Sequence, residues 1–569
     1  MSVLSQPEFL PAGRAEMERL GWTGLDILLV QGDAYLDHPA QGPALLGRWL
    51  VAHGFRTGLI SQPRWQNPAE ARQDLTALGR PRLMAALSAG SMDSMLAHYT
   101  AFRKKRSDDA LTPGGRAGAR PNRATLVYSG LLRAVFPGLP ILIGGLEASL
   151  RRLSHYDFWQ DKLRRSFLLE SKADLLVYGP GERPLLEAAR RLGRGEAETA
   201  LENIPGTVRP RRAPGPFPDG ALELPSHEDI LSRPALLMAA TLAAEKLAHQ
   251  GGRAAWQSSG ERAVLMQPPA EPLSQAELDF LYGLPFSRRA HPAYREKIPA
   301  LSLLAASLTT HRGCGGGCSF CSLALHQGRR VASRSLGSIV NEARRLGAAR
   351  PLALSDVGAA TANLWGARCL AGPENCRRVS CLWPGICPHL EADQRRWLAM
   401  LKELAALPGI KQVRVASGLR YDLALSDEKT LGDFLACFVG GQLKVAPEHL
   451  DPYILSLMRK PGPDLFQRFL KFFESRSGPR PYLTPYLISA FPGSDPQRMR
   501  LLAGWFQKRR WRPRQVQAFI PTPGTVATAM FFAGVDERGR PLKIARSDRE
   551  RLAQHAWLRP SPPGPQAGA

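Results

Sequence analysis

Cysteine is scarce in this chain, and the few cysteines are not spread along it. Only eight of the 569 residues are cysteine, and seven of these lie between positions 314 and 387. A disulfide framework needs more cysteines at dispersed positions, whereas a local group indicates metal binding in a reducing compartment. The sequence therefore excludes a disulfide scaffold and favours a metalloprotein.

Long apolar runs are also missing. No stretch approaches the roughly 20 apolar residues that a membrane-spanning helix needs. The first residues, MSVLSQPEFLPAGRAEMERLGW, lack the basic segment followed by an apolar run that marks a secretory signal. We therefore expect a cytoplasmic protein with no membrane partner.

Acidic residues are outnumbered, because 50 Asp and Glu stand against 75 Lys and Arg and give a formal net charge of +25. Such a charge permits binding of RNA or of an acidic substrate. Much of it is arginine scattered through predicted helices, so a compositional bias without such a partner stays open. The length and a hydrophobic content of 44% predict two or three domains with cores of their own.

The densest chemical motif is THRGCGGGCSFCSLALHQGRR, residues 310–330. It holds Cys314, Cys318 and Cys321 in C-x3-C-x2-C spacing, and the glycines at 315–317 let the backbone turn tightly between them. A structural zinc site uses four ligands, whereas a [4Fe–4S] cluster held by three thiolates keeps one iron free for a cofactor or substrate. The motif predicts such a cluster, with three unligated thiols in a glycine-rich turn as the alternative.

A second cysteine group follows within the Pro- and Gly-rich insertion 359–390. Its spacing is C-x6-C-x4-C-x5-C, formed by Cys369, Cys376, Cys381 and Cys387. Four sulfurs in so short a segment suit a zinc ion or an auxiliary iron–sulfur cluster, and unligated surface thiols are the alternative. The remaining cysteine, Cys437, lies in the apolar run LGDFLACFVG and is expected in a hydrophobic core.

The first 200 residues alternate between strand-like and helix-like patterns. Strands are expected at 26–30, 55–60, 82–90, 125–128, 140–143 and 174–178, with helices at 43–53 and 92–99. This alternation predicts a Rossmann-like parallel-sheet domain over residues 1–200. Residues 201–299 are expected to form a linker and helical connector, with a Pro- and Arg-rich linker at 204–225, a helix at 233–249 and a capped short helix from Ser274.

From residue 300 the alternation becomes regular. Strands are expected at 301–309, 351–356, 412–417, 442–446, 482–490 and 514–520. Six such βα units predict an α/β fold with a partial (β/α)6 barrel over residues 300–545, whose functional loops gather at one rim. Residues 546–569 remain as a C-terminal tail, and its last ten residues, PSPPGPQAGA, should be disordered.

Several local sequences are specific enough to carry a family resemblance. They are LHQGRR at 325–330, SDVG at 355–358, VASGLRYD at 415–422, KVAPEH at 444–449 and QVQAFIPTPGT at 515–525, with GDAYLDHP, GGLEASLRR and GERP before residue 200. Through them the chain resembles the YgiQ-type radical SAM (S-adenosylmethionine) family from about residue 9 to about residue 559. The resemblance implies that a [4Fe–4S] cluster on Cys314, Cys318 and Cys321 cleaves SAM reductively, and that the resulting 5′-deoxyadenosyl radical attacks an unknown substrate. It also implies an external one-electron donor of the flavodoxin or ferredoxin type.

Polar residues at the expected strand ends are candidates for binding SAM: Ser355, Gly358, Ser417, Arg420 and Glu448. Arg420 could hold a carboxylate through two parallel hydrogen bonds. Glu448 could accept hydrogen bonds from an ammonium group or a ribose hydroxyl. For each of them an ordinary ion pair at the barrel rim is the alternative.

The first 200 residues also resemble the domain that precedes the barrel in cobalamin-binding radical SAM enzymes. The ligand pattern Asp-x-His-x-x-Gly is absent, however, and Asp37 and His38 stand side by side instead. We therefore expect no cobalamin held by a histidine.

Two alternatives remain beside a radical SAM enzyme that acts on a small molecule or polypeptide. One is an RNA-modifying radical SAM enzyme, suggested by the net charge and by the basic, aromatic run 505–514, WFQKRRWRPR, which could stack on bases. The other is a non-catalytic iron–sulfur protein that kept the fold.

Overall fold

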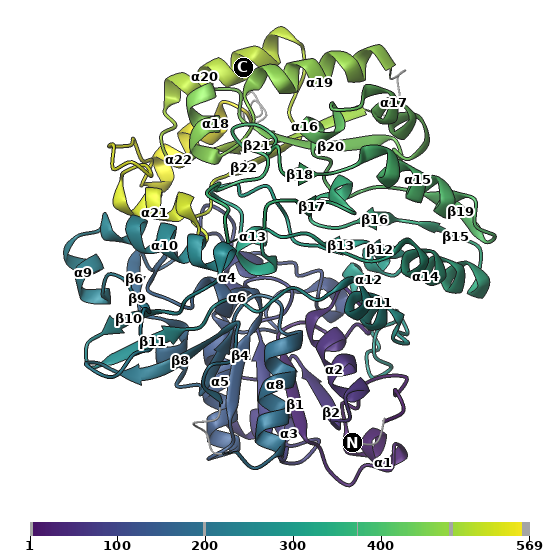
Figure 1. Cartoon of the computed structure of the whole chain (residues 1–569), viewed down its shortest axis with the longest axis vertical. Coiled ribbons are helices and arrows are strands. Elements are labelled where there is room, and N and C mark those ends of the chain that lie inside the picture. The colour runs from purple at the N-terminus through teal and green to yellow at the C-terminus, as the bar shows by residue number, and fades with distance from the viewer. Residues whose placement is uncertain (1–3, 197–200, 373, 477–481, 560–569) are drawn as a thin grey trace, which may run out of the picture.

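The computed structural model describes residues 4–196, 201–372, 374–476 and 482–559. The chain forms two stacked halves. Roughly the first 300 residues build the lower half of Figure 1, and the rest of the chain builds the half above it.

Among the described residues, one nine-stranded sheet organises the first half, in the order β2-β1-β3-β4-β7-β8-β11-β10-β9. The strands are β1 (Ile27–Gln31), β2 (Thr57–Ser61), β3 (Met84–Ser88), β4 (Ile141–Gly144), β7 (Leu175–Val177), β8 (Thr207–Arg212), β9 (Leu222–Glu223), β10 (Ala255–Ser259) and β11 (Arg262–Met266). The first five pair in parallel, so their carboxyl ends share one edge. β1 is buried along its whole length, as expected for a strand covered by helices on both faces.

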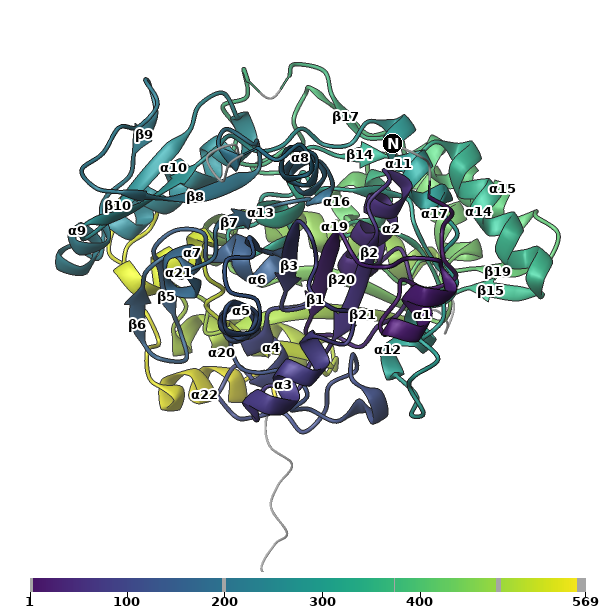
Figure 2. The same cartoon turned by 90° about the horizontal axis from the view of Figure 1, so that it is seen from below.

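Short helices connect these strands. They are α1 (Arg14–Arg19), α2 (Gly42–Ala52), α3 (Pro68–Leu75), α4 (Ser94–His98), η1 (Pro113–Gly115), α5 (Ala124–Val135), α6 (Gly145–Leu150), α7 (Phe167–Ser171), α8 (Glu182–Gly193), α9 (His227–Ser232), α10 (Leu236–Gln250) and α11 (Gln275–Gly283), with a hairpin of β5 (His155–Asp157) and β6 (Lys162–Arg164). Seen from below in Figure 2, α2, α5 and α8 lie around the strands β1, β2 and β3. A reciprocal cap between Ser274 and Glu277 starts α11, which confirms the predicted start.

Two local predictions for this half are wrong. Residues 125–128 lie in α5 and not in a strand, because Thr125, Tyr128 and Leu132 recur at helical spacing and bury one face. The segment 204–225 is no linker, since it supplies β8 and β9. The sequence of β8, TVRPRR, has the proline and arginine content of a linker. Its residues nevertheless pair with β7 on one side and β11 on the other, and this pairing makes the segment a strand.

In the second half, the described residues form six strand positions of an open barrel. These are β12 (Ser307–Thr309), β15 (Leu352–Leu354) continued by β16 (Asp356–Gly358), β19 (Ile410–Val413), β20 (Gln442–Glu448), β21 (Tyr482–Ser489) and β22 (Gln515–Ala518). β12 pairs with β16, β15 with β19, β20 with β21 and β21 with β22, all in parallel. The predicted strand at 301–309 is too long, because its first part belongs to a helix that begins at Pro299.

The helices of this half are α12 (Pro299–Leu304), α13 (Leu323–Gln327), α14 (Leu336–Ala349), η3 (Ala362–Leu364), α15 (Gln394–Ala405), α16 (Tyr421–Ala424), α17 (Glu428–Cys437), α18 (Pro452–Met458), α19 (Pro463–Arg476), α20 (Pro496–Lys508), α21 (Val526–Ala533) and α22 (Asp548–Ala556). Two small antiparallel pairs complete it, β13 (His311–Arg312) with β14 (Ala332–Ser333) and β17 (Arg368–Cys369) with β18 (Leu390–Glu391).

The C-terminal segment from residue 546 is more than a tail. It forms α22, in which the fully buried Arg551 donates to the carbonyl of Phe519, and the ring of His555 hydrogen-bonds the hydroxyl of Ser489 at 2.9 Å. The helix therefore packs on the barrel and belongs to it. The predicted disorder of residues 560–569 lies outside the described residues.

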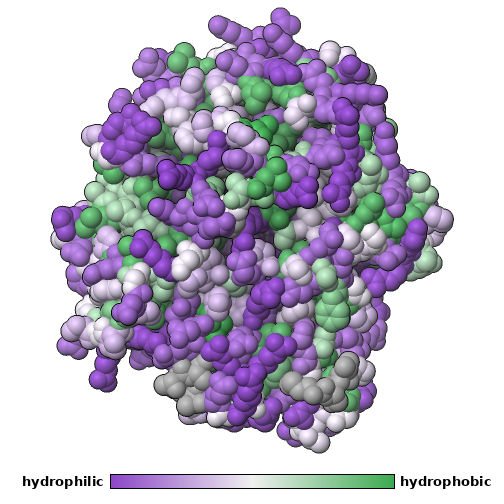
Figure 3. All heavy atoms as spheres, viewed as in Figure 1, coloured by the Kyte–Doolittle hydropathy of each residue, from purple (hydrophilic) through white to green (hydrophobic). Residues whose placement is uncertain are grey.

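Ion pairs tie the two halves together. Arg312 of the barrel pairs with Glu182 of the first half at 2.5 Å, Arg459 pairs with Glu245 at 2.7 Å, and Arg288 pairs with Glu342. Both members of these pairs are largely buried. Part of the large positive charge is thus neutralised by buried carboxylates inside the molecule. The face shown in Figure 3 is covered mostly by hydrophilic residues with scattered hydrophobic ones.

Candidate functional site

The three cysteines of the C-x3-C-x2-C motif lie on the loop between β13 and α13. Burial and the neighbouring thiols of Cys318 and Cys314 raise the pKa of Cys321 to about 12. Gly316 faces the space between the thiols, because a Cβ there would stand 3.3 Å from the sulfur of Cys314 and 3.8 Å from that of Cys318. A side chain at this position would fill the space, so the loop and its donor atoms fit a thiolate-bound cluster.

Glycine is also required at the next position. Gly317 has a φ of +58°, and a Cβ there would lie 2.2 Å from the carbonyl oxygen of Val379. The backbone of Gly317 is left-handed, and the insertion 359–390 packs directly against it. A residue with a Cβ therefore does not fit at this position.

Arg420 is the charged group next to the thiols. Its Nη1 lies 4.0 Å from the sulfur of Cys318, and its Nε donates to Asp422 at 2.9 Å. Burial would lower the pKa of this guanidinium, but Asp422 outweighs burial and the net pKa is raised. The side chain of Asn363 accepts a hydrogen bond from the Arg420 backbone at 3.0 Å. Arg420 is therefore a fixed cation beside the thiols.

Glu448 lies near the same group. It is 8% exposed and has a left-handed backbone with a φ of +66°, a conformation that costs energy in a non-glycine residue. Burial raises its pKa, against the opposing effects of Lys460, whose Nζ is 4.0 Å away, and of Arg420. Because the Lys460 ammonium is as far as 4.0 Å away, the buried carboxylate of Glu448 can accept further hydrogen bonds.

Gly358 and Ser417 meet at neighbouring strand ends, since a Cβ on Gly358 would lie 3.1 Å from the Ser417 hydroxyl. That hydroxyl donates to Asp356, which also accepts the backbone N–H groups of Ala416 and Ser417. Ser355 does not join this group. Its hydroxyl donates to the carbonyl of Leu303 at 3.1 Å on the exposed side, because neighbouring residues of a strand face opposite ways.

Sequence reasoning missed several residues of the site. The hydroxyl of Thr361 lies 3.4 Å from the sulfur of Cys314, while Asn363 and Asp422 position Arg420, and Lys460 faces Glu448. Asp422 is the last residue of the motif VASGLRYD, and Thr361 and Asn363 stand at the start of the insertion 359–390. Lys460 follows α18, and nothing in its local sequence marks it.

The second cysteine group lies in the insertion beside the first loop. Cys369 is exposed, and Cys376, Cys381 and Cys387 are half-buried. Within the described residues, no three Asp, Glu, His or Cys side chains already converge tightly enough to hold a single metal ion. Cys437 is exposed on α17, so its predicted core position is wrong; the buried face of that helix is formed by residues such as Leu431 and Phe434.

Comparison with known proteins assigns the sequence to a family. A model described as "Radical SAM N-terminal" matches residues 9–307. A UPF0313 protein of Geobacter sulfurreducens is 47% identical over 97% of this chain and 92% of its own length, and the UPF0313 protein YgiQ of Escherichia coli is 39% identical over 97% of this chain and 84% of its own length. The chain belongs to the YgiQ-type UPF0313 radical SAM family.

Two matching solved structures were compared, and the first of them shows a similar fold. The radical SAM methyltransferase TsrM of Kitasatospora setae, with cobalamin and a [4Fe–4S] cluster bound, matches 94% of this chain and 85% of its own with a TM-score of 0.52 and 16% identity. The cobalamin-dependent radical enzyme OxsB, with aqua-cobalamin and SAM bound, matches 91% of this chain and 57% of its own with a TM-score of 0.46 and 11% identity.

In this family member a cavity of about 410 Å³ lies between the sheet edge and the barrel. Strand-end turns line one side of it, at Gly90, Gly144 and Gly179, and His311 and His326 line the other. Residues of α13, which follows Cys321 directly, form part of the wall. The cavity therefore lies between the carboxyl edge of the sheet and the helix that follows the cluster loop, and the carboxyl edge is the usual place for ligands in open parallel sheets.

His38 does not line this cavity. It is fully buried, the backbone N–H of Ala40 donates to its Nδ1 at 3.0 Å, and its Nε2 lies 3.0 Å from the Arg288 guanidinium. Its neighbour Asp37 is bonded to Arg48. Both residues are thus engaged in internal contacts, and the absence of a histidine ligand for cobalamin stays a prediction.

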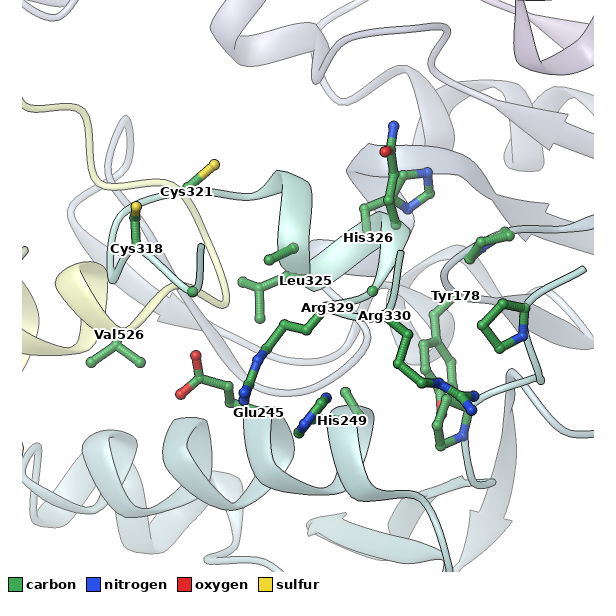
Figure 4. Close-up of a pocket in the computed structure, with 18 of the residues that line it drawn as sticks. Tyr178, Glu245, His249, Cys318, Cys321, Leu325, His326, Arg329, Arg330 and Val526 are labelled. Carbon is green, nitrogen blue, oxygen red and sulfur yellow. The ribbon is translucent and has the colours of Figure 1, made fainter. Parts of the chain in front are cut away.

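A smaller pocket of about 70 Å³ lies behind the cluster loop, against α10. Figure 4 shows the side chain of Arg329 extending toward Glu245 and His249, while the sulfurs of Cys318 and Cys321 point away from them. Cys318 and Cys321 nevertheless belong to the lining of this pocket. Among the described residues, no helix is long and apolar enough to cross a membrane.

Proposed function

We propose that this protein is a radical SAM enzyme that binds a [4Fe–4S] cluster through Cys314, Cys318 and Cys321 and cleaves SAM reductively. The observation that carries the proposal is the space between the three thiols, kept open by Gly316 and bordered by the buried Arg420 and by Glu448. When bound, the cluster supplies the electron that splits the sulfonium of SAM into methionine and a 5′-deoxyadenosyl radical.

The chain's own residues bind and orient SAM. Arg420 offers the edge of its guanidinium that faces Cys318 to the carboxylate of SAM, because the opposite edge is held by Asp422. Glu448 accepts hydrogen bonds from the ammonium group of SAM. Gly358 and Ser417 form a close-packed wall at the neighbouring strand ends.

The substrate is expected in the 410 Å³ cavity, because the sheet edge and residues of α13, the helix that follows the cluster loop, both line it. Burial lowers the pKa of His326 to about 4, and its Nδ1 hydrogen-bonds the hydroxyl of Ser149 at 3.1 Å. A neutral imidazole in this position can hydrogen-bond a substrate without adding a charge to the cavity. The electron comes from an external one-electron donor of the flavodoxin or ferredoxin type.

The contacts of the run 505–514, all of whose residues the structure describes, do not favour the RNA-modifying alternative. In the run 505–514, the face of Trp505 is covered by the Arg509 guanidinium at 3.9 Å, and Trp511 packs edge-on against Phe506 at 5.4 Å. These rings are used in packing at the end of α20, so they are not a free platform for stacked bases.

The experiment is anaerobic reconstitution followed by a SAM-cleavage assay under reduction. Wild type should bind iron and sulfide and release 5′-deoxyadenosine, and the triple variant Cys314→Ala, Cys318→Ala, Cys321→Ala should release none. Cys437→Ala, in which an exposed thiol far along the sequence is removed, is the matched control and should behave as wild type. Deoxyadenosine release by the triple variant would overturn the proposal, and its absence from loaded wild type would favour the non-catalytic alternative.

A further inference from the structure

The insertion that holds the second cysteine group is a closed loop. Its stem is the β17–β18 pair, in which Cys369 stands opposite Leu390. Within the loop, the backbone N–H of Cys387 donates to the carbonyl of Cys381 at 2.8 Å, and the N–H of Leu390 donates to the carbonyl of Cys387 at 2.9 Å. The stem and these two hydrogen bonds bring Cys369 and Cys387 toward the same end of the loop.

The other three cysteines are alike in burial, since Cys376, Cys381 and Cys387 are all half-buried. Two arginines lie close by: Arg329 donates to the carbonyl of Arg378 at 2.7 Å, and Arg377 is exposed beside Cys376 in the sequence. Positive charge near these thiols would stabilise the thiolate form, which is the form that binds a metal.

Few buried side chains stabilise the loop. Of its described residues between 370 and 390, only Ser380 and Leu382 are buried, whereas Leu370 and Ile386 are 61% and 41% exposed. Arg378 folds back to donate to the carbonyls of Ser380, Trp383 and Gly385. A segment with so small an apolar core usually depends on a cross-link or a metal for its stability.

The loop is also docked on the first cysteine motif. The N–H of Cys381 donates to the carbonyl of Gly315 at 2.8 Å, and the hydroxyl of Ser380 donates to the carbonyl of Gly316 at 2.5 Å. A Cβ on Gly315 would lie 3.5 Å from the sulfur of Cys381. The two cysteine groups are therefore parts of one packed unit.

We propose that Cys369, Cys376, Cys381 and Cys387 bind a second iron–sulfur cluster beside the first. Thiolates of this kind hold zinc ions as well as iron–sulfur clusters. Because the second group is docked on the loop of the first, we assign it the same kind of centre, and the metal analysis below separates a cluster from a zinc ion. On assembly each thiol loses its proton to solvent and forms one Fe–S bond, without a change in the oxidation state of sulfur. The proposal stands independently of SAM cleavage.

The test is metal content of the full-length protein after anaerobic reconstitution with iron and sulfide. Wild type should hold about eight iron and eight sulfide, since each [4Fe–4S] cluster contributes about four of each. The double variant Cys376→Ser, Cys387→Ser should hold about half of that, and Cys437→Ser should match wild type. A double variant with undiminished iron would overturn the proposal.

The reciprocal variant decides the question even if the double variant fails to fold, because it leaves the insertion untouched. With Cys314, Cys318 and Cys321 replaced by serine, the chain should still hold about four iron and four sulfide and keep the visible absorption of a cluster. No bound metal in this variant would overturn the proposal. About one zinc without sulfide would keep a thiolate-bound metal at these cysteines but overturn its assignment as an iron–sulfur cluster.

Discussion

The guanidinium of Arg420 lies 4.0 Å from the sulfur of Cys318 and is fixed there by its hydrogen bonds to Asp422. These three residues come from the cluster loop and from the start of α16, more than 100 positions apart. Asp422 occupies one edge of the guanidinium, so Arg420 can bind a carboxylate only through the part that faces the thiols. This fixes the direction from which a carboxylate can bind.

Replacing this anchor tests the SAM-binding assignment. Arg420→Gln should weaken SAM binding about ten- to a hundredfold, because a charge-assisted hydrogen bond contributes about 1.5–3 kcal/mol. The measurement is the KM for SAM in the deoxyadenosine assay, together with iron content. Arg395→Gln, which removes a guanidinium paired with Asp427 on the surface, is the control. An unchanged KM in Arg420→Gln would remove Arg420 from the SAM site.

Gly316 offers a test of the space between the thiols. Gly316→Ala places a methyl group 3.3 Å from the Cys314 sulfur and 3.4 Å from the Arg420 guanidinium, so iron loading should fall severalfold while the Tm of the metal-free protein changes little. Gly337→Ala in α14, where the nearest atom would be 3.9 Å away, should leave iron loading unchanged and raise stability by about 0.5–1 kcal/mol. Equal iron loading in both variants would contradict the geometry described here.

The ion pair between Arg312 and Glu182 should contribute to holding the two halves together. Arg312→Met leaves a buried carboxylate without its partner, so the free energy of unfolding should fall by about 3–5 kcal/mol. Arg468→Met breaks a surface pair with Glu428 and should cost about 1 kcal/mol or less. Urea unfolding of the metal-free variants measures both, and similar losses in the two would show that the interface pair is not special.

Stability should fall on mild acidification. Burial lowers the pKa of His326 and His449 to about 4, whereas histidine in the unfolded chain takes up a proton near 6.5. Between about pH 6.5 and 4 the unfolded state therefore binds more protons, and each such histidine removes about 1.4 kcal/mol of stability per pH unit. His326→Gln should show a shallower loss of unfolding free energy between pH 6.5 and 5. The same slope in variant and wild type would contradict the assignment of a buried neutral imidazole.

His38 is predicted to play no part in binding cobalamin. Its ring is enclosed by Ala40 and Arg288 and lies outside the lining of the cavity. After addition of hydroxocobalamin and removal of the excess, wild type and His38→Ala should have the same visible spectrum. A stoichiometric complex in wild type that is lost in His38→Ala would show that this prediction is wrong.

The sequence was sufficient for features whose cause is local. The strand at Ile27–Gln31 is a continuous apolar run, α11 begins at a capping box on Ser274, and the cysteine loop is defined by its spacing. Features set by distant partners were missed. β8 is a strand because β7 and β11 pair with it, and Ser355 leaves the site because Leu303 accepts its hydroxyl on the opposite face.

The site shows the same division. Spacing alone was enough to propose Cys314, Cys318 and Cys321 as ligands, and the expected strand ends were enough to propose Arg420 and Glu448; the roles of all five stay predictions. Lys460 could not, because its approach to Glu448 depends on how α18 returns to the barrel. The docking of Cys381 on Gly315 is likewise a contact between segments over 60 residues apart.

SAM is predicted to bind at the cluster held by Cys314, Cys318 and Cys321. This is tested by the electron paramagnetic resonance spectrum of the variant with Cys376 and Cys387 replaced by serine, reduced anaerobically and recorded with and without SAM. We expect the signal of one reduced cluster, whose g values change when SAM is added because SAM binds the iron that lacks a cysteine ligand. A reduced cluster whose spectrum is the same with and without saturating SAM would show that SAM does not bind there.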